Sequence, residues 1–262
     1  MTIWFIETCM LADERTQEFR DACNAADVGI QTIFDVDQPN ESKRKPPEPD
    51  ASVIAYGSKS ILAFAKARRW RPGVWTGSAF DYDRAHAGLG EIFLNASAVA
   101  TTLTQADTAA RTKAWPTIFI RPSNDDKAFA GQVIATEGLA EWRERNTANG
   151  YLSDPNLDVI IAPPQSLRRE WRLIVAGGEI VAASLYREAG EKAVSEGCPE
   201  PVSHFAKQAH ARYEPAPVFV MDVAELADSS LAIVELNAFN SADLYACNIA
   251  NVVSRVTAVA RH

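Results

Sequence analysis

The chain has 262 residues, of which 47% are hydrophobic, and it carries a formal net charge of −8 with a pI of about 5.1. That length allows one large domain or two to three small lobes with an ample apolar core. Proteins that bind nucleic acids through their overall charge usually carry a basic face, so the acidic balance argues against a nucleic-acid partner.

Hydropathy and cysteine usage narrow the cellular setting. No apolar run approaches the length of about 18 residues that a membrane-spanning helix needs, so we expect no membrane segment. The first residues include no basic leader, so we expect no signal peptide. The four cysteines, Cys9, Cys23, Cys198 and Cys247, show no CxxC spacing, which is typical of free thiols in a reducing cytoplasm. We therefore predict a cytoplasmic protein.

Strands and helices alternate in the first third of the chain. Short apolar runs predict strands at 2–7, 29–34 and 52–56. Helical spacing of apolar residues predicts helices at 13–25 and 61–69. An alternation of this kind is typical of an α/β fold with a small parallel sheet.

The turn Tyr56-Gly57-Ser58 joins the third strand to the helix that follows it. A helix N-terminus carries unpaired N–H groups and attracts anions, so this turn is a candidate anion site. Ser58 is also a favoured N-cap residue, and an ordinary helix cap is the simpler interpretation.

The middle of the chain predicts a second group of elements. A turn-rich connection at 70–77 comes first, and the alanine-rich stretch at 94–114 then predicts one or two helices, because alanine is the strongest helix former. The remaining elements are predicted strands at 117–120, 132–135 and 158–162 and a predicted helix at 139–149.

The last third of the chain predicts an antiparallel sheet. Residues 170–187 form two apolar runs around Gly177-Gly178, a turn of the type that hairpins favour. The strands that carry Asp222 and Glu235 are predicted to pair across a short acidic turn. The remaining elements are predicted helices at 201–213 and 242–260.

Three oxygen-bearing side chains lie in apolar runs near the end of the chain, Asp222 in VFVMDVAEL and Glu235 and Asn237 in AIVELNAF. A carboxylate is costly to bury unless it meets a cation or a hydrogen-bond donor. Glu235 and Asn237 are two positions apart, so they point to the same side of a strand. The structural alternative is a strand-end carboxylate that caps a loop. Mg²⁺ prefers oxygen ligands, usually together with phosphates and water, so the pattern predicts a nucleotide–metal site.

Basic residues lie near other predicted strand ends. Arg121 ends a strand and Lys127 lies in the polar loop SNDDKAFAG, an arrangement that can close over phosphates. The alternative is that both are exposed surface charges. Glu170 and Arg172 share one face of the hairpin, and Arg187 lies on its other strand. These three either serve the same site or form a cross-strand salt bridge.

Two other kinds of site are not supported. The sequence has no GxxxxGK[ST] motif, which argues against a Walker-type phosphate loop. Ser166 and Cys198 have no histidine at a recognisable spacing, so nucleophilic catalysis is not predicted.

The order of these motifs resembles the ATP-grasp superfamily, and especially its RimK-related clade of ATP-dependent carboxylate–amine ligases. A strand-end Arg-Pro, a loop lysine with a later glycine, E-x-R, a lone strand aspartate and a final E-x-N carry the resemblance over residues 121–248. It implies an α/β and α+β chain with an ATP-grasp fold, in which two α+β lobes clasp ATP. The implied domains are a preceding α/β lobe at 1–92 and an ATP-grasp domain at 93–262, with a nucleotide-covering lobe at 93–162 and a metal-binding, catalytic lobe at 163–262.

The resemblance also implies which residues bind the metal and the phosphates. Asp222, Glu235 and Asn237 would bind one or two Mg²⁺ ions, and Lys127 would lie in the flexible loop that covers the phosphates. Arg121 stands where a phosphate-binding lysine is usual. The segment AFNSADLY follows Asn237 where many ligases have a Pro-Gly turn. These are the two departures from the pattern of the superfamily.

Further roles are implied along the nucleotide. The strand that contains Ile160 and Ala162 would supply the hinge, with these two residues as the adenine contacts. Arg172 and Arg187 would face the γ-phosphate and the acyl-phosphate intermediate. Glu170 would orient Arg172.

The implied activity is ATP- and Mg²⁺-dependent ligation of a carboxylate to an amine. The carboxylate attacks the γ-phosphate to give an acyl phosphate, and the amine then displaces phosphate. Small molecules or peptides are the implied substrates, while the acid, the amine and the oligomeric state stay open. The alternatives are a nucleotide-binding regulatory module that does not turn ATP over, and a phosphoryl transferase.

Overall fold

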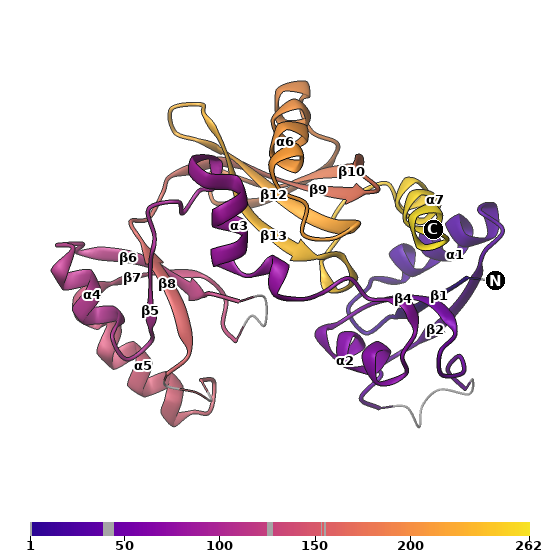
Figure 1. Cartoon of the computed structure of the whole chain (residues 1–262), viewed down its shortest axis with the longest axis horizontal. Helices are drawn as coiled ribbons and strands as arrows, with labels where there is room; N and C mark the ends of the chain where they lie inside the picture. The colour runs from indigo at the N-terminus through magenta and orange to yellow at the C-terminus, as the bar shows by residue number, and fades with distance from the viewer. Residues whose placement is uncertain (1, 39–44, 125–127, 153, 155) are drawn as a thin grey trace.

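The computed structural model describes residues 2–38, 45–124, 128–152, 154 and 156–262 of the chain (Figure 1). The described residues form three sheets, two with four strands and one with five. This mixed α/β and α+β architecture confirms the predicted fold class.

The N-terminal sheet is parallel, as the alternation of strands and helices predicts. Its elements are β1 (Ile3–Glu7), α1 (Asp13–Ala25), β2 (Gly29–Ile33), β3 (Ser52–Tyr56), α2 (Lys59–Ala67) and β4 (Arg71–Gly73). The strand order is β2-β1-β3-β4, so the apolar runs of β1 and β3 lie at the buried centre. β4 lies in the stretch predicted to contain only turns, and it counts as a strand because its backbone pairs with β3.

A linker that the sequence patterns did not resolve connects this sheet to the rest. It contains the helix α3 and two short 3₁₀ helices. Their bounds are η2 (Ser78–Phe80), α3 (Tyr82–Leu89) and η3 (Gly90–Ile92). The helix buries Tyr82, Ala85 and Leu89 against the five-stranded sheet. Such a short helix has little periodicity to detect and depends on this packing for its stability.

The middle sheet is antiparallel. Its elements are β5 (Val99–Thr102), α4 (Ala106–Thr112), β6 (Thr117–Pro122), β7 (Gln132–Ala135), η4 (Thr136–Gly138), α5 (Leu139–Ala148) and β8 (Asp158–Ala162). The strand order is β5-β8-β6-β7. The prediction of only helices at 94–114 was wrong, because this stretch contains β5 before α4. Val99 and the two threonines of β5 are β-branched, and their pairing with β8 outweighs the helix propensity of the alanines.

The five-stranded sheet is antiparallel and carries the polar motifs. Its elements are β9 (Leu167–Ala176), β10 (Glu179–Glu188), β11 (Glu191–Glu196), α6 (Glu200–Arg212), β12 (Val218–Leu226) and β13 (Leu231–Ala238). The order is β11-β10-β9-β12-β13, which confirms the predicted hairpin and the pairing of the two ligand strands. Gly177 and Gly178 both have positive φ, at 59° and 80°, as the hairpin turn requires. β11 was not predicted, since it is a mostly exposed edge strand of polar residues.

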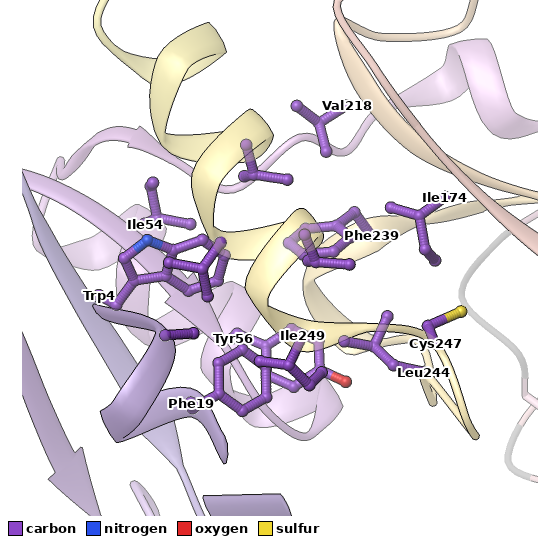
Figure 2. Packing of buried hydrophobic residues seen from close by; sticks show 14 of the residues in the cluster. Trp4, Phe19, Ile54, Tyr56, Ile174, Val218, Phe239, Leu244, Cys247 and Ile249 are labelled. Carbon is purple, nitrogen blue, oxygen red and sulfur yellow. The ribbon is translucent and has the colours of Figure 1, made fainter. Parts of the chain in front are cut away.

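The end of the chain returns to the N-terminal sheet, where α7 lies beside α1 (Figure 1). The last elements are η5 (Phe239–Ser241) and α7 (Ile249–Ala260). The helix begins later than the predicted residue 242, because Asn248 caps it by accepting a hydrogen bond from the Asn251 N–H. Figure 2 shows Trp4 and Phe19 packed with Phe239 and Ile249 from the other end of the chain. The Trp4 indole also donates to the Thr257 hydroxyl over 2.9 Å.

The three sheets lie within residues 3–73, 99–162 and 167–238, one in each segment of the predicted division. Because α7 contributes to the core of the first lobe, the predicted boundaries stay a prediction. Among the described residues, no helix has both the length and the apolar character needed to cross a membrane.

Candidate active site

One face of the five-stranded sheet gathers the polar residues that the sequence singles out. Arg172 on β9 lies opposite Asp222 on β12, and Asp222 lies opposite Glu235 on β13. Glu170 is two positions from Arg172 on the same face. The alternate residues of β9, such as Trp171, point instead into the core beneath α3 and α6. Strand alternation and cross-strand register therefore bring these side chains to one place.

Arg172 and Asp222 form a buried, bidentate ion pair. Nε and Nη2 of Arg172 donate to the two carboxylate oxygens of Asp222 over 2.9 and 2.7 Å, and Asp222 is 1% exposed. A third donor of Arg172, Nη1, reaches the backbone carbonyl of Asp243 over 2.9 Å. Bidentate Arg–carboxylate pairs combine geometric specificity with strength, so this pair fixes the guanidinium firmly.

The charges of this pair act on each other and on Glu235. Burial raises the pKa of Asp222 to about 6, although the Arg172 guanidinium acts in the opposite direction. Burial alone lowers the pKa of Arg172, but the Asp222 carboxylate raises it above its ordinary value. Glu235 adds to both shifts, because it repels the Asp222 charge and attracts that of Arg172. Both partners are therefore ionised at neutral pH, beside a second carboxylate.

Glu235 and Asn237 complete the predicted oxygen set. The Asn237 amide donates to Oε1 of Glu235 over 2.8 Å. Arg121 of β6 donates to Oε2 over 3.3 Å, and this ion pair connects the middle sheet to the five-stranded sheet. The register shifts between Asp222 and the residue after it, so Val234 is an extra residue on β13. Such a bulge redirects side chains, and here both Val234 and Glu235 face the same cavity.

Glu170 has different partners from those predicted. The Tyr186 hydroxyl donates to its Oε2 over 2.8 Å, and Nη1 of Arg187 donates to its Oε1 over 3.4 Å. The prediction that Glu170 orients Arg172 was wrong, because Asp222 provides that contact. Sequence reasoning missed Tyr186, although two adjacent polar residues at the end of β10 interrupt strict alternation and could have indicated a bulge.

A cavity of about 780 Å³ lies between the middle sheet and the five-stranded sheet. Its wall combines charged groups with apolar side chains. Predicted site residues in the wall are Arg121, Glu170, Arg187 and Glu235. Residues of the wall that the sequence did not single out include Lys59, Leu94, Phe119, Phe129, Pro164 and Gln165.

Three predicted contacts need separate mention. Ile160 and Ala162 are buried within β8, and among the described residues the wall contains Pro164 and Gln165 just after this strand instead. A strand at the centre of a sheet turns its side chains into the cores on both faces, which explains the difference. Lys127 lies outside the described residues.

The turn before α2 is a helix cap. Both oxygens of the buried Glu7 accept backbone N–H groups, one from Val36 over 2.8 Å and one from Ser58 over 2.7 Å. The Ser58 hydroxyl accepts from the N–H of Ser60. Since a carboxylate of the chain already lies at this N-terminus, the structure favours the cap over an external anion site.

The oxygen set fits a magnesium ion that shares its ligands with phosphates. Within the described part of the chain, no three His, Cys, Asp or Glu side chains gather as a metal group. Asp222 and Glu235 supply two adjacent carboxylates, and Asn237 can supply an amide oxygen. Mg²⁺ is often held by one or two carboxylates together with phosphates and water, so this set is sufficient in kind.

Comparison with solved structures finds the same fold in several proteins. D-cycloserine synthetase DcsG is 15% identical, with a TM-score of 0.66 over 98% of this chain and 99% of that one. A RimK domain ATP-grasp protein from Sphaerobacter thermophilus is also 15% identical, with a TM-score of 0.65 over the whole of both chains. The ATP-grasp ligase PsnB, in complex with precursor peptide PsnA2 and AMPPNP, is 13% identical, with a TM-score of 0.57 over 99% and 97%.

Sequence comparison places the chain in a family. No curated protein matches it. Residues 93–254 match a family described as an ATP-grasp domain, the second family of its clade, and this match covers more than half of the chain. The chain therefore belongs to this family of ATP-grasp domain proteins.

Proposed function

We propose that this protein is an ATP- and Mg²⁺-dependent carboxylate–amine ligase that acts through an acyl phosphate. Membership of an ATP-grasp family supports the proposal, as does the shared fold of DcsG, a synthetase, and PsnB, a ligase. The single observation that carries it is the meeting of Asp222, Glu235 and Asn237 on one face, at the wall of a cavity large enough for a nucleotide.

The cavity suits ATP in size and in lining. Leu94, Phe119 and Phe129 offer apolar surface for a base, and Arg121 and Arg187 offer positive charge for phosphates. In this proposal the described residues bind the phosphates together with Lys127. Ile160 and Ala162 keep their proposed hinge role only through the backbone.

Asp222, Glu235 and Asn237 would hold Mg²⁺. When bound, the ion supplies charge neutralisation between the phosphates and the attacking carboxylate. For Glu235 to serve as a ligand, Arg121 moves from the carboxylate to a phosphate oxygen, which suits a side chain that can bind either group.

The reaction then needs charge stabilisation and positioning rather than a side-chain nucleophile. A substrate carboxylate attacks the γ-phosphorus and ADP leaves; an amine attacks the resulting acyl phosphate and inorganic phosphate leaves. Arg172 and Arg187 would stabilise the negative charge that develops on the transferred group. Arg172 is already held by Asp222 and the Asp243 carbonyl, so it needs little reorganisation.

The test is Glu235→Gln, assayed for ADP release with panels of small carboxylates, peptides and amines. We expect ADP release to fall by roughly 100-fold or more, because a transition-state charge loses its partner. Glu188→Gln is the matched control, since Glu188 is an exposed carboxylate on β10 that pairs with Arg169. Equal turnover in wild type and Glu235→Gln contradicts the proposal. Trapping with hydroxylamine then distinguishes ligation, which gives a hydroxamate, from phosphoryl transfer to a hydroxyl group.

A nucleotide-binding regulatory module is the second candidate. The Arg121–Glu235 ion pair favours it, because the pair occupies a phosphate-binding cation and a metal-binding carboxylate at once. Calorimetry with ATP and Mg²⁺ separates the candidates: stable binding without ADP after long incubation supports the module. Under either candidate we propose a cytoplasmic protein whose partners are small molecules or peptides.

A further inference from the structure

The residue Tyr186 lies at an irregularity of β10. Leu185 pairs with Trp171 and Arg187 pairs with Glu170, so Tyr186 is an extra residue in the ladder with β9. Strict alternation would turn Tyr186 and Arg187 to opposite faces. The bulge lets both of them reach Glu170. Bulges are frequent next to active sites, where they redirect a side chain.

The contacts of Tyr186 join two parts of the site. Its hydroxyl donates to Glu170, a residue of the cavity wall. Its ring stacks on Tyr245, with the ring centroids 4.9 Å apart and the planes 6° from parallel. The guanidinium carbon of Arg172 lies 5.6 Å from the centroid of Tyr186 and 5.1 Å from that of Tyr245. Distances of this size allow a cation–π interaction with each ring.

The chemistry of the hydroxyl suits a fixed donor. Burial, and then the charges of Asp222 and Glu170, raise the pKa of Tyr186 well above its ordinary value. The phenol is therefore protonated at any physiological pH and donates to the carboxylate. Glu170 is buried, and its other hydrogen bond comes from Arg187, whose side chain is 53% exposed. The contact with Tyr186 is the shorter of the two.

We propose that Tyr186 is a positioning residue that holds Glu170 against the nucleotide and, together with Tyr245, holds Arg172 beside Asp222. This inference rests on the proposed function, because it assumes that the cavity binds a nucleotide. Among the described residues, the cavity wall includes Glu170 and Arg187 but not Tyr186, so Tyr186 acts through its neighbours.

The experiment is calorimetric titration of the full chain with AMPPNP and MgCl₂. Tyr186→Phe removes the hydroxyl and keeps the ring, and we expect its affinity for AMPPNP to fall roughly tenfold, because a hydrogen bond to a buried charge is lost. Tyr245→Phe is the matched control, since its ring stays in the stack, and its affinity stays within about twofold of wild type.

A double-mutant cycle with Glu170→Ala separates positioning from a general loosening of the strand. If Tyr186 acts through Glu170, Tyr186→Phe costs no further affinity once Glu170 is alanine, and its urea midpoint stays close to that of Tyr245→Phe. Wild-type affinity in Tyr186→Phe, or the same loss in both backgrounds, overturns the inference. If Glu170→Ala does not fold, the comparison of the two phenylalanine variants decides alone. Absence of AMPPNP binding by the wild type overturns the proposed function, and the inference with it.

Discussion

Two arginine–aspartate pairs of this protein have the same geometry and opposite surroundings. In the pair of Arg172 with Asp222 and in the pair of Arg69 with Asp50, Nε and Nη2 donate over 2.9 and 2.7 Å. The Arg69 and Asp50 side chains are 67% and 51% exposed, whereas Asp222 is almost inaccessible. The hydrogen bond from Arg69 lowers the pKa of Asp50, while burial raises that of Asp222.

The comparison teaches that surroundings, not bond lengths, decide what an ion pair does. Water screens the surface pair, and each partner stays solvated when the other is removed. In the buried pair, each charge depends on the other, because the loss of one leaves an uncompensated charge in the interior. The Arg121–Glu235 pair is intermediate, with side chains 14% and 28% exposed and a single 3.3 Å contact between two sheets.

The largest expected effect is that of Asp222→Ala. Arg172 loses both carboxylate acceptors inside the protein, so we expect the free energy of unfolding to fall by about 3–5 kcal/mol. Urea denaturation followed by tryptophan fluorescence measures it. Asp50→Ala is the control, with no resolvable change. Similar losses in both variants would show that geometry matters more than burial.

A smaller effect is expected for Arg172→Lys. Lysine keeps the charge but loses the planar fork that serves Asp222 and the Asp243 carbonyl, and it loses the contacts with the two tyrosine rings. We expect a loss of about 1–3 kcal/mol in the free energy of unfolding. Arg69→Lys is the surface counterpart and should unfold at the wild-type urea concentration. A wild-type midpoint for Arg172→Lys is the result that speaks against a preorganised guanidinium.

Glu235→Gln should separate stability from ligand binding. The Arg121 contact is long and partly solvated, so we expect the free energy of unfolding to change by less than about 1 kcal/mol. The gain in AMPPNP affinity on adding MgCl₂ should disappear, because the amide is a poorer metal ligand. Titration with MgCl₂ and again with EDTA measures this difference. A variant that retains the full magnesium effect would remove Glu235 from the metal site.

Arg121→Lys should have the smallest effect on folding. Lysine can keep one contact with Glu235, so we expect a change within about 0.5 kcal/mol. It also restores the residue that the ATP-grasp resemblance leads one to expect at this position. The unfolding midpoint of this variant is best compared directly with that of Arg172→Lys. A larger loss for Arg121→Lys would reverse the order of the two pairs.

The sequence was most informative where one local pattern decides the outcome. The apolar runs at 52–56 and 158–162 and the helical spacing at 13–25 predicted the bounds that the structure shows. The stretch at 94–114 failed, because its strand forms only through pairing with β8. β11 was missed for a similar reason, since its polar residues have no periodicity and depend on β10.

The sequence by itself determined the side-chain chemistry and the faces: alternation alone places Glu170 with Arg172, and Glu235 with Asn237. Only the tertiary structure decided the partners. Arg172 meets Asp222 across 50 positions of sequence, Arg121 meets Glu235 across 114, and a bulge turns Tyr186 toward Glu170. The physical reason is that alternation is a property of one strand, whereas register and sheet order depend on the packing of strands distant in the sequence.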